Sequence, residues 1–545
     1  MDTIRVENAE IAAQLEAFAA LLELNGASYY TARAYRRAAE LIRDTPAPVA
    51  ELVEQGRARE LRGIGPGIEA RLRELVETGE LEELEELRVT LMPELVGLGH
   101  LLGVGPKRMR ELAAALGVRT TDEFRAAVLE GRLRSVPGVG PKTEAKLRAG
   151  LERAAKPKPR RGLLLNRAWA LAGGVADALG GEVAGDPRRW RDSCEDFAVV
   201  VAADQPEPVL DAFEELAQIV SIVERQERRA IGVTVEGVPV ELVVAATSSF
   251  GTELVRATGS PDYVRDLGPL TDAVDEAGVY DALGVPWCPP ELRERPHRDE
   301  PPPFLLRLDD VRGDLHVHTT GSDGKASVLE MGEAAIALGY EYVAICDHTT
   351  NVRVVPGLDA DAVRRQAEEI AEANERLAPF RVLRGIECDI LPDGSLDLPD
   401  DVLAELDWVQ LSLHAGQRQA GAELTRKVTQ AMRHPAVRCL SHPTGRLINH
   451  RPPNALDLER AIEVALEEGV ALEVNGLPDR LDLRDEHVRL AVEAGVQICA
   501  NTDAHSVRGL GNMRLAVATA RRGAAQLGDV LNTKPLEQVL ALRKR

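Results

Sequence analysis

Over roughly residues 307–540, short apolar runs alternate with stretches of helical periodicity. The apolar runs include Tyr342–Cys346, Val382–Ile386, Trp408–Leu413, Val437–Ser441 and Val496–Ala500. Histidine, aspartate or glutamate follows each of these runs directly or within a few residues. Because a β/α barrel presents its active-site groups at the carboxyl ends of its strands, the pattern predicts such a barrel with a site at one end.

The segment Gly313–Gly324 opens this series. His316 and His318 lie two positions apart, so on a strand both side chains point to the same face and can share one ion, together with Asp323 in the next loop. The other candidate metal ligands are His348, Glu387, His414, His442, Asp503 and His505. Six of the 11 histidines of the chain fall in this set, which an ordinary scatter of surface histidines does not explain.

The residue types in this set indicate a particular chemistry. Mixed imidazole and carboxylate ligands suit Mn²⁺, Zn²⁺ or Fe²⁺ better than Mg²⁺ or Ca²⁺, which prefer oxygen ligands. Two close ions can activate a water molecule and stabilise the leaving oxygen of a phosphoester. We therefore expect a metal-dependent phosphoesterase.

Length and composition place this barrel in a larger protein. At 545 residues the chain is long enough for three or four domains. No run of about 18 apolar residues appears, and the charged amino terminus does not have the pattern of a signal sequence. We expect a cytoplasmic protein with no membrane contact. The six cysteines form no C-x-x-C pair, so we expect reduced thiols in the core.

The net charge of −22 argues against broad electrostatic adhesion to nucleic acid. Three segments near the amino terminus nevertheless share a Gly-apolar-Gly turn between helical stretches: Leu61–Gly67, Leu102–Lys107 and Val136–Lys142. Such turns leave backbone N–H groups at a helix start, where they bind phosphate without net positive charge. The candidate DNA-binding residues are Gly63, Gly65, Gly103, Gly105, Lys107, Gly138, Gly140 and Lys142.

These motifs resemble two known families. The ordered set H-x-H, Asp, His, Glu, His, His and D-x-H resembles the PHP (polymerase and histidinol phosphatase) family, and the glycine turns resemble helix-hairpin-helix motifs. Together with Ile11–Leu52, their order along the chain resembles the family X DNA polymerases, the group that includes DNA polymerase beta, whose bacterial members often carry a carboxy-terminal PHP domain.

The resemblance implies a multidomain α/β protein. We expect a helical amino-terminal domain in residues 1–90, a second helix-hairpin-helix region in 91–160, a nucleotidyltransferase α+β palm in 161–290, a linker in 291–306, and a distorted (β/α)7 PHP barrel in 307–545. In the PHP family up to three ions are bound. By resemblance His316, His318, Glu387 and Asp503 hold one ion, Glu387, His414 and His442 a second, and Asp323, His348 and His505 a third.

The middle region departs from the polymerase pattern. Polymerases of this family use three carboxylates to hold two Mg²⁺ or Mn²⁺ ions, and the matching positions are Asp196, Ala198 and Glu241. The Gly-Ser that cradles the nucleotide triphosphate reads Gly185-Asp186. Arg71 replaces the lysine that forms a Schiff base in lyase-competent relatives, and a guanidinium cannot supply a neutral amine. We expect weak or no nucleotide addition and no lyase activity by that route.

Four functions remain open at this stage. The first is a DNA repair protein whose PHP domain is a 3′-5′ exonuclease on gapped DNA or DNA ends, with sequence-independent DNA binding by the front half. The second is a working gap-filling DNA polymerase with an attached nuclease, which would also bind dNTPs. The others are a small-molecule phosphatase of the histidinol-phosphate type and a non-catalytic scaffold on DNA ends. We expect a monomer.

Overall fold

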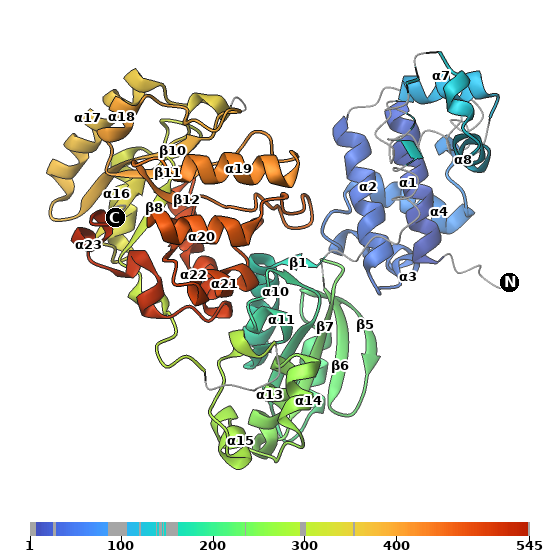
Figure 1. Cartoon of the computed structure of the whole chain (residues 1–545). Helices are drawn as coiled ribbons and strands as arrows, with labels where there is room; N and C mark the ends of the chain where they lie inside the picture. The colour runs from blue at the N-terminus through green and yellow to red at the C-terminus, as the bar shows by residue number, and fades with distance from the viewer. Residues whose placement is uncertain are drawn as a thin grey trace. The chain divides into compact units, whose positions relative to one another are not determined.

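The computed structural model describes residues 7–24, 29–84, 106–118, 121–137, 139–140, 144, 147–148, 162–234, 236–294, 301–352 and 355–542 (Figure 1). By internal contacts the chain forms two compact units. The first unit comprises residues 1–161, 177–181 and 203–244, and the second comprises residues 162–176, 182–202 and 245–545. The division into five domains expected from the sequence is finer than this and stays a prediction.

The first unit begins with a helical region. Its elements are α1 (Asn8–Leu24), α2 (Tyr29–Asp44), α3 (Val49–Glu54), the 3-10 turn η1 (Ala58–Glu60) and α4 (Pro66–Thr78). Ile11, Leu15, Ile42, Leu61 and Leu72 are among the fully buried side chains of its core. The apolar residues of α4 recur at helical spacing, and Pro66 at its first position suits a helix start because the proline nitrogen has no N–H to leave unpaired.

A second, smaller helical core lies further along the same unit. It is built from α7 (Pro106–Leu116), α8 (Thr121–Leu129) and η2 (Arg132–Ser135), with Met109, Phe124 and Leu133 at its centre. The unit also contains α12 (Glu207–Glu214) and the antiparallel strands β5 (Ile219–Arg225), β6 (Arg229–Thr234) and β7 (Pro239–Ala245).

The second unit contains the remaining elements of the middle region. Strand β1 (Leu163–Leu164) pairs antiparallel with β3 (Ser193–Cys194), and β2 (Glu182–Ala184) pairs antiparallel with β4 (Phe197–Ala202). The helices are α10 (Leu165–Leu179), α11 (Gly185–Arg188), α13 (Phe250–Thr258), α14 (Pro261–Leu267) and α15 (Glu276–Leu283), with short turns η3 (Thr247–Ser249) and η4 (Pro290–Leu292).

The rest of the second unit is a parallel barrel of seven strands in the order β14-β13-β12-β11-β10-β9-β8. The strands are β8 (Gly313–Val317), β9 (Tyr342–Ile345), β10 (Arg381–Asp389), β11 (Trp408–Ser412), β12 (Val437–Leu440), β13 (Ala471–Asn475) and β14 (Ile498–Asn501). A parallel bridge between Val317 and Ala504 brings the first and last strands together, so the sheet nearly closes.

Helices surround these strands (Figure 1). They are α16 (Val328–Ala337), α17 (Ala360–Leu377), α18 (Asp400–Ala404), α19 (Gly421–Met432), α20 (Leu458–Glu468), α21 (Asp485–Glu493), α22 (Met513–Arg522) and α23 (Leu536–Leu540). Short 3-10 turns complete the barrel: η5 (Leu308–Asp310), η6 (Thr350–Val352), η7 (Val507–Asn512), η8 (Leu527–Asp529) and η9 (Leu531–Thr533). Because both faces of the strands are covered, β8, β9 and β14 are buried at every position.

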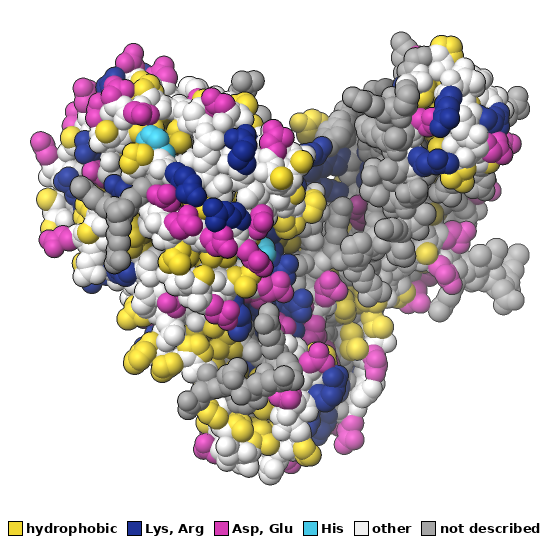
Figure 2. All heavy atoms as spheres, in the orientation of Figure 1, with side chains coloured by type: hydrophobic (Ala, Val, Ile, Leu, Met, Phe, Trp, Pro, Cys, Tyr) yellow, Lys and Arg dark blue, Asp and Glu magenta, His cyan; other side chains and the backbone are white. Residues whose placement is uncertain are grey.

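The expected fold class is confirmed: a helical amino-terminal region, mixed α/β elements in the middle, and a carboxy-terminal parallel barrel of seven strands. All six cysteines are buried and free, as expected. Within the described ranges, no helix has the length and apolar character needed to cross a membrane. Asp and Glu side chains are spread over the visible surface, in keeping with the net charge of −22 (Figure 2).

Candidate metal centre

The nine candidate ligands lie where the barrel places active-site groups. His316 and Glu387 are on strands β8 and β10, and the others directly follow strands or lie in the loops after them. The strands are parallel, so their carboxyl ends meet at one rim. The structure brings all nine side chains together at this rim, through contacts of their ring nitrogens and carboxylate oxygens.

The first group consists of His316, His318 and Asp503. The Nε2 atoms of the two histidines face each other at 3.1 Å, and Asp503 Oδ1 lies 3.0 Å from His318 Nε2 and 3.7 Å from His316 Nε2. Glu387 Oε2 is 3.6 Å from His316 Nε2 and 3.7 Å from His318 Nε2. These four residues are the set that the sequence assigned to one ion.

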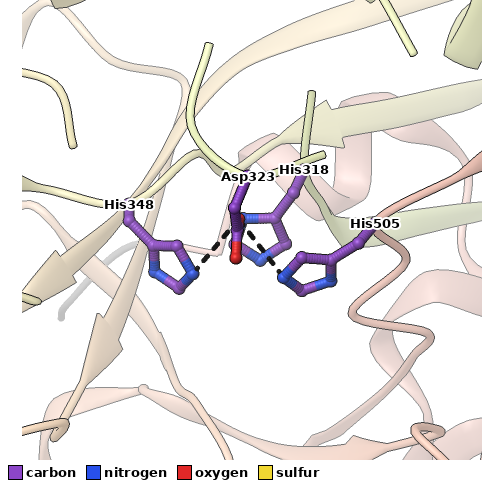
Figure 3. A group of neighbouring side chains, drawn as sticks. All are labelled: His318, Asp323, His348 and His505. Atoms are coloured by element: carbon purple, nitrogen blue, oxygen red, sulfur yellow. Dashed lines mark ion pairs between the residues drawn. The ribbon is translucent and has the colours of Figure 1, made fainter. Parts of the chain in front are cut away.

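A second group surrounds the Asp323 carboxylate (Figure 3). Its Oδ1 lies 3.4 Å from His505 Nε2, 3.6 Å from His348 Nε2 and 3.9 Å from His318 Nδ1. The expected trio Asp323, His348 and His505 is therefore together. The ring of His318 also borders this group, which the sequence assignment did not include.

A third group consists of His348, His414 and His442, which surround the Glu387 carboxylate. Glu387 connects this group to the first two. Its Oε1 lies 2.9 Å from His442 Nε2 and 3.6 Å from His414 Nε2, while its Oε2 lies 2.7 Å from His348 Nδ1. His348 thus faces Glu387 with one ring nitrogen and Asp323 with the other. A carboxylate among imidazoles from several strands is an arrangement that can hold more than one ion.

Several polar atoms at this rim are buried without any hydrogen bond. They are the Nδ1 atoms of His318, His348, His414 and His442, and Oε2 of Glu387. The contact between His348 Nδ1 and Glu387 Oε2 is short but lacks hydrogen-bond geometry. Of these atoms, Nδ1 of His318, Nδ1 of His348 and Oε2 of Glu387 face other candidate ligands. Buried polar atoms normally have partners, so unpaired atoms in such positions fit bound cations. The residues present therefore fit the metal ions that the sequence implied.

The pKa values show how strongly the charges in the site are coupled. Burial lowers the pKa of His316, but the carboxylates of Glu473, Asp503 and Glu387 outweigh burial and raise it well above the ordinary value. Burial, with help from the His348 and His505 rings, lowers the pKa of His318 to about 4. The His318 ring is therefore neutral near pH 7 and can offer a lone pair.

In the group around Asp323, the interactions between charges outweigh burial, unlike at His318. Burial disfavours charge on His505, but the hydrogen bond and charge of Asp323 outweigh it and raise the pKa of His505 to about 9. Burial raises the pKa of Asp323, but His505 outweighs burial and lowers that pKa to about 2. Without a bound ion, the carboxylate and the imidazolium hold each other in their charged forms, and binding of a metal ion to His505 would release the proton.

Residues outside the nine candidate ligands orient the ligands, and of these sequence reasoning missed Glu473 and Asp389. Glu473, fully buried on β13, accepts a hydrogen bond from His316 Nδ1 at 2.7 Å, and this contact turns Nε2 of His316 toward Asp503. Asp389 accepts the backbone N–H of His414 at 3.0 Å. Asp347 accepts the backbone N–H of Thr319 at 2.8 Å and so fixes the loop that leads to Asp323. A charged residue between the apolar residues Leu472 and Val474 was the available signal for Glu473.

Two candidate ligands have unusual backbone conformations. His442 has φ +24° and Asp503 has φ +53°, in the left-handed region that side chains other than glycine rarely adopt. Such a conformation costs on the order of 1 kcal/mol and persists where the surrounding structure holds it, which is common at functional sites. The backbone N–H of His442 donates to Glu473 Oε2 at 2.8 Å, which helps to hold this turn.

The structure describes only some of the candidate DNA-binding residues in the amino-terminal half of the chain. Gly63 has φ +116°, which requires glycine, and Gly65 immediately precedes helix α4. Among the residues that the structure describes, no atom lies within 4 Å of a side chain placed at Gly65 or Gly140. Gly103, Gly105, Gly138 and Lys142 lie outside the described residues, as does the side chain of Lys107.

Arg71, at the position of the lyase lysine, has a structural role. Its guanidinium donates to Glu74 at 2.8 Å and also contacts Glu83, and it lies 5.5 Å from the centre of the Phe18 ring. The hydrogen bond to Glu74 raises the pKa of Arg71. A guanidinium held in ion pairs supplies no nucleophile.

The residues at the positions expected of the palm carboxylates are exposed or paired with arginine. Asp196 is exposed and lies one residue before β4, on which Ala198 is buried. Glu241 on β7 accepts a hydrogen bond from Arg229 at 2.8 Å. Asp186 is buried, and one of its carboxylate oxygens accepts the backbone N–H groups of Glu195 and Asp196 at 2.8 and 3.0 Å.

The neighbours of Asp186 complete a network. Its second oxygen pairs with Arg189, which donates to Glu294 at 2.9 Å. Arg522 on barrel helix α22 donates to the backbone oxygen of Arg189 at 2.6 Å and to Asp485 at 2.7 Å. The loop expected to face a triphosphate is therefore joined by hydrogen bonds to the barrel.

Comparisons with known proteins agree with this organisation. The family described as Helix-hairpin-helix domain matches residues 6–81, and the SAM-like Helix-hairpin-helix tandem matches residues 95–153. The PHP domain family matches residues 314–476. A probable phosphatase of Acetivibrio thermocellus is 30% identical over 201 residues, covering 35% of this chain and 78% of that protein. A probable phosphatase of a Thermoanaerobacter species is 25% identical over 245 residues, covering 43% of this chain and 95% of that protein.

One relative matches almost from end to end. The DNA polymerase/3′-5′ exonuclease PolX of Bacillus subtilis is 33% identical over 564 residues, and the alignment covers 97% of this chain and 98% of that protein. The two phosphatases cover only 35% and 43% of the chain, whereas this relative covers nearly all of it, including the helix-hairpin-helix and middle regions. The chain therefore belongs to the PolX family of DNA polymerases with a carboxy-terminal PHP domain.

Proposed function

We propose that this chain is a metal-dependent 3′-5′ exonuclease that removes nucleotides from DNA ends at the PHP barrel. The observation that carries the proposal is the meeting of imidazoles from several strands around the Glu387 carboxylate. The name of the Bacillus subtilis relative includes the same activity, and the alignment covers nearly the whole chain. Hydrolysis of a phosphodiester is the reaction that this set of ligands suits best.

The residues that would hold the ions are the nine named above, with up to three ions of Mn²⁺, Zn²⁺ or Fe²⁺. When bound, such ions supply an activated water and charge stabilisation for the leaving oxygen. Glu473 would keep His316 in one tautomer and orientation, and Asp389 would do the same for the His414 loop. Asp347 would hold the Asp323 loop against the barrel.

The helix-hairpin-helix turns would bind the DNA backbone. Gly63 and Gly65 precede a 13-residue helix, and backbone N–H groups at a helix start bind phosphate and read no base. Gapped duplexes and 3′ ends are the substrates that such binding would deliver. Sequence-independent binding is consistent with a strongly acidic chain that has small local contacts for phosphate.

The alternative of a working gap-filling polymerase is favoured by one finding, the word polymerase in the name of the full-length relative. The pairing of Glu241 with Arg229 and the burial of Ala198 oppose it in this chain. A small-molecule phosphatase is supported by the partial relatives, but it leaves the amino-terminal motifs without a role. A scaffold without catalysis leaves the orphaned ligand atoms unexplained.

The test is an assay with a 5′-labelled primer annealed to a template, in the presence of Mn²⁺ and then after removal of metal by a chelator. We expect shortening of the primer from its 3′ end with Mn²⁺ and no shortening after chelation. Hydrolysis of a small phosphomonoester with an intact primer would instead support the phosphatase alternative and contradict the proposal.

A second experiment tests DNA binding by the front half. The double variant Lys107→Glu and Lys142→Glu should lower affinity for gapped DNA by about tenfold and by the same factor on unrelated sequences. The matched control is Arg365→Glu with Arg376→Glu, two exposed positions on α17. An equal loss in the control, or no loss in the lysine variant, would show that these turns do not carry the binding.

A further inference from the structure

Three consecutive loops of the barrel pack together beside the metal centre. They follow β11, β12 and β13, and the first two begin with the ligands His414 and His442. Asn454 Nδ2 donates to Gln417 Oε1 at 3.4 Å, which joins the first loop to the second. The backbone N–H of Ile448 donates to the oxygen of Asp479 at 2.7 Å, which joins the second loop to the third. The loops therefore form one continuous edge.

A glycine allows the first two loops to come this close. Gly445 has φ +56°, and a Cβ atom there would lie 2.0 Å from Gln417 Oε1. The Gln417 side chain is itself held by a hydrogen bond from Nε2 to the Leu413 oxygen at 2.6 Å. The positive φ favours glycine at position 445, and a side chain there would force the Gln417 side chain to move.

We call three arginines, one selected from each loop, the arginine rim: Arg418, Arg451 and Arg480. Arg480 Nε lies 3.8 Å from Oδ2 of the candidate ligand Asp503, so this end of the rim borders the metal centre. Arg451 Nε donates to the Gly445 oxygen at 2.8 Å, in the turn that follows His442. Arg418 is exposed and, among the described residues, makes no ion pair or hydrogen bond.

The charges of the rim act on one another. Burial lowers the pKa of Arg451, and the positive charges of Arg480 and Arg418 lower it further, while Asp482 and Asp479 raise it. Repulsion between like charges costs stability and is offset when an anion binds between them. On the viewed face of the molecule, Lys and Arg side chains occur in small groups among acidic ones (Figure 2). A local group of guanidiniums is thus the kind of site that attracts phosphate to an acidic protein.

We propose that the arginine rim binds the backbone phosphates of the DNA strand whose 3′ end enters the metal centre. This inference rests on the proposed exonuclease function. It gives a physical reason why the enzyme would prefer a polynucleotide to a small phosphoester. A strand with several phosphates can contact successive arginines, whereas a small diester offers only its reacting phosphate. The rim therefore acts on positioning and affinity of the strand and leaves the chemical step to the metal centre.

The test compares two substrates with the full chain and Mn²⁺. The first is a 5′-labelled single-stranded oligonucleotide, and the second is bis(p-nitrophenyl) phosphate, a diester with no neighbouring phosphates. In Arg418→Ala we expect kcat/KM for the oligonucleotide to fall by about tenfold, and by much less for the small diester. The plot of log kcat/KM against log salt should become shallower by about 0.7 for each phosphate that the variant no longer binds.

Arg418 is exposed, so its replacement should leave the fold intact, and Arg451→Ala provides a second position. The matched control is Arg376→Ala, in the last turn of α17. If wild-type protein shortens the oligonucleotide and the rim variants behave like Arg376→Ala, the arginine rim is wrong and the exonuclease stands. If wild-type protein cleaves the small diester and leaves the oligonucleotide intact, the exonuclease function itself fails.

Discussion

The barrel rim and the middle-region strands β2 and β4 belong to the same compact unit, yet they use their carboxylates in opposite ways. At the rim, Glu387 and Asp503 face imidazole nitrogens, and Nδ1 of His348 and Oε2 of Glu387 have no hydrogen bond. Around β2 and β4, Asp186 is instead satisfied by Arg189 and by backbone N–H groups. The rim offers lone pairs to cations, whereas in the middle region the Asp186 carboxylate is already paired with Arg189 and backbone N–H groups.

The comparison shows that carboxylates can stabilise a fold through ion pairs in one region and remain available to bind metal ions in another. Ion pairs that need no ligand stabilise the middle region internally, as in the pairing of Glu276 with both Arg188 and Arg293. A functional metal site needs the reverse, with like charges and lone pairs left to be compensated by the ion.

The largest expected effect is at the rim. Replacing Glu387 by alanine removes the carboxylate that faces all three groups, so Mn²⁺-dependent hydrolysis should fall by roughly a thousandfold or more. The measurement is kcat/KM on a labelled primer with circular dichroism as a check of the fold. Glu369→Ala, at an exposed position of α17, is the matched control. Near wild-type rates in Glu387→Ala would remove this residue from the site.

A smaller effect on metal binding is expected at Glu473, which contacts the ligand His316 but is not itself a candidate ligand. Glu473→Gln keeps the size of the side chain but weakens the hydrogen bond to His316 Nδ1, so metal affinity should fall by about 10 to 100-fold. A calorimetric titration of metal-free protein with Mn²⁺ measures this affinity directly. Unchanged affinity together with lowered stability would assign Glu473 to the fold alone.

The middle region should respond to acid. Burial raises the pKa of Glu276, but Arg188 and Arg293 outweigh it and lower the pKa to about 2, below the ordinary 4.5. The ion pairs therefore stabilise the fold fully above about pH 4.5, and the stabilisation is lost as pH falls from there toward 2. Glu276→Gln would also leave the fully buried Arg293 without a carboxylate partner.

The expected cost of Glu276→Gln at pH 7 is on the order of 3 kcal/mol, seen as a lower unfolding temperature. The gap between variant and wild type should narrow as the pH is lowered from 5 to 3.5. Glu372→Gln, exposed on α17, should show no gap at any pH. A gap that widens in acid would mean that the sign of the Glu276 shift is wrong.

The sequence predicted the barrel and the meeting of its nine candidate ligands because that pattern is local: each ligand lies on or shortly after an apolar strand. Glu473 and Asp389 were missed, since their roles depend on which strands become neighbours. The contact of His318 with the Asp323 group was missed for the same reason. Likewise, the sequence showed that Asp186 was out of place for a triphosphate site, but the inward turn of its carboxylate depends on Arg189 and two backbone N–H groups.

The central claim is that catalysis resides at the barrel rim and that the palm is inactive. One measurement addresses it directly: a 5′-labelled primer on a one-nucleotide gap, incubated with Mn²⁺ and all four dNTPs, with wild type, Glu387→Ala, and Glu387→Ala combined with Asp196→Ala. We predict shortening by wild type, and neither shortening nor extension by the two variants. Extension of the primer by Glu387→Ala that disappears when Asp196 is also replaced would contradict the account, because it would reveal a working polymerase site.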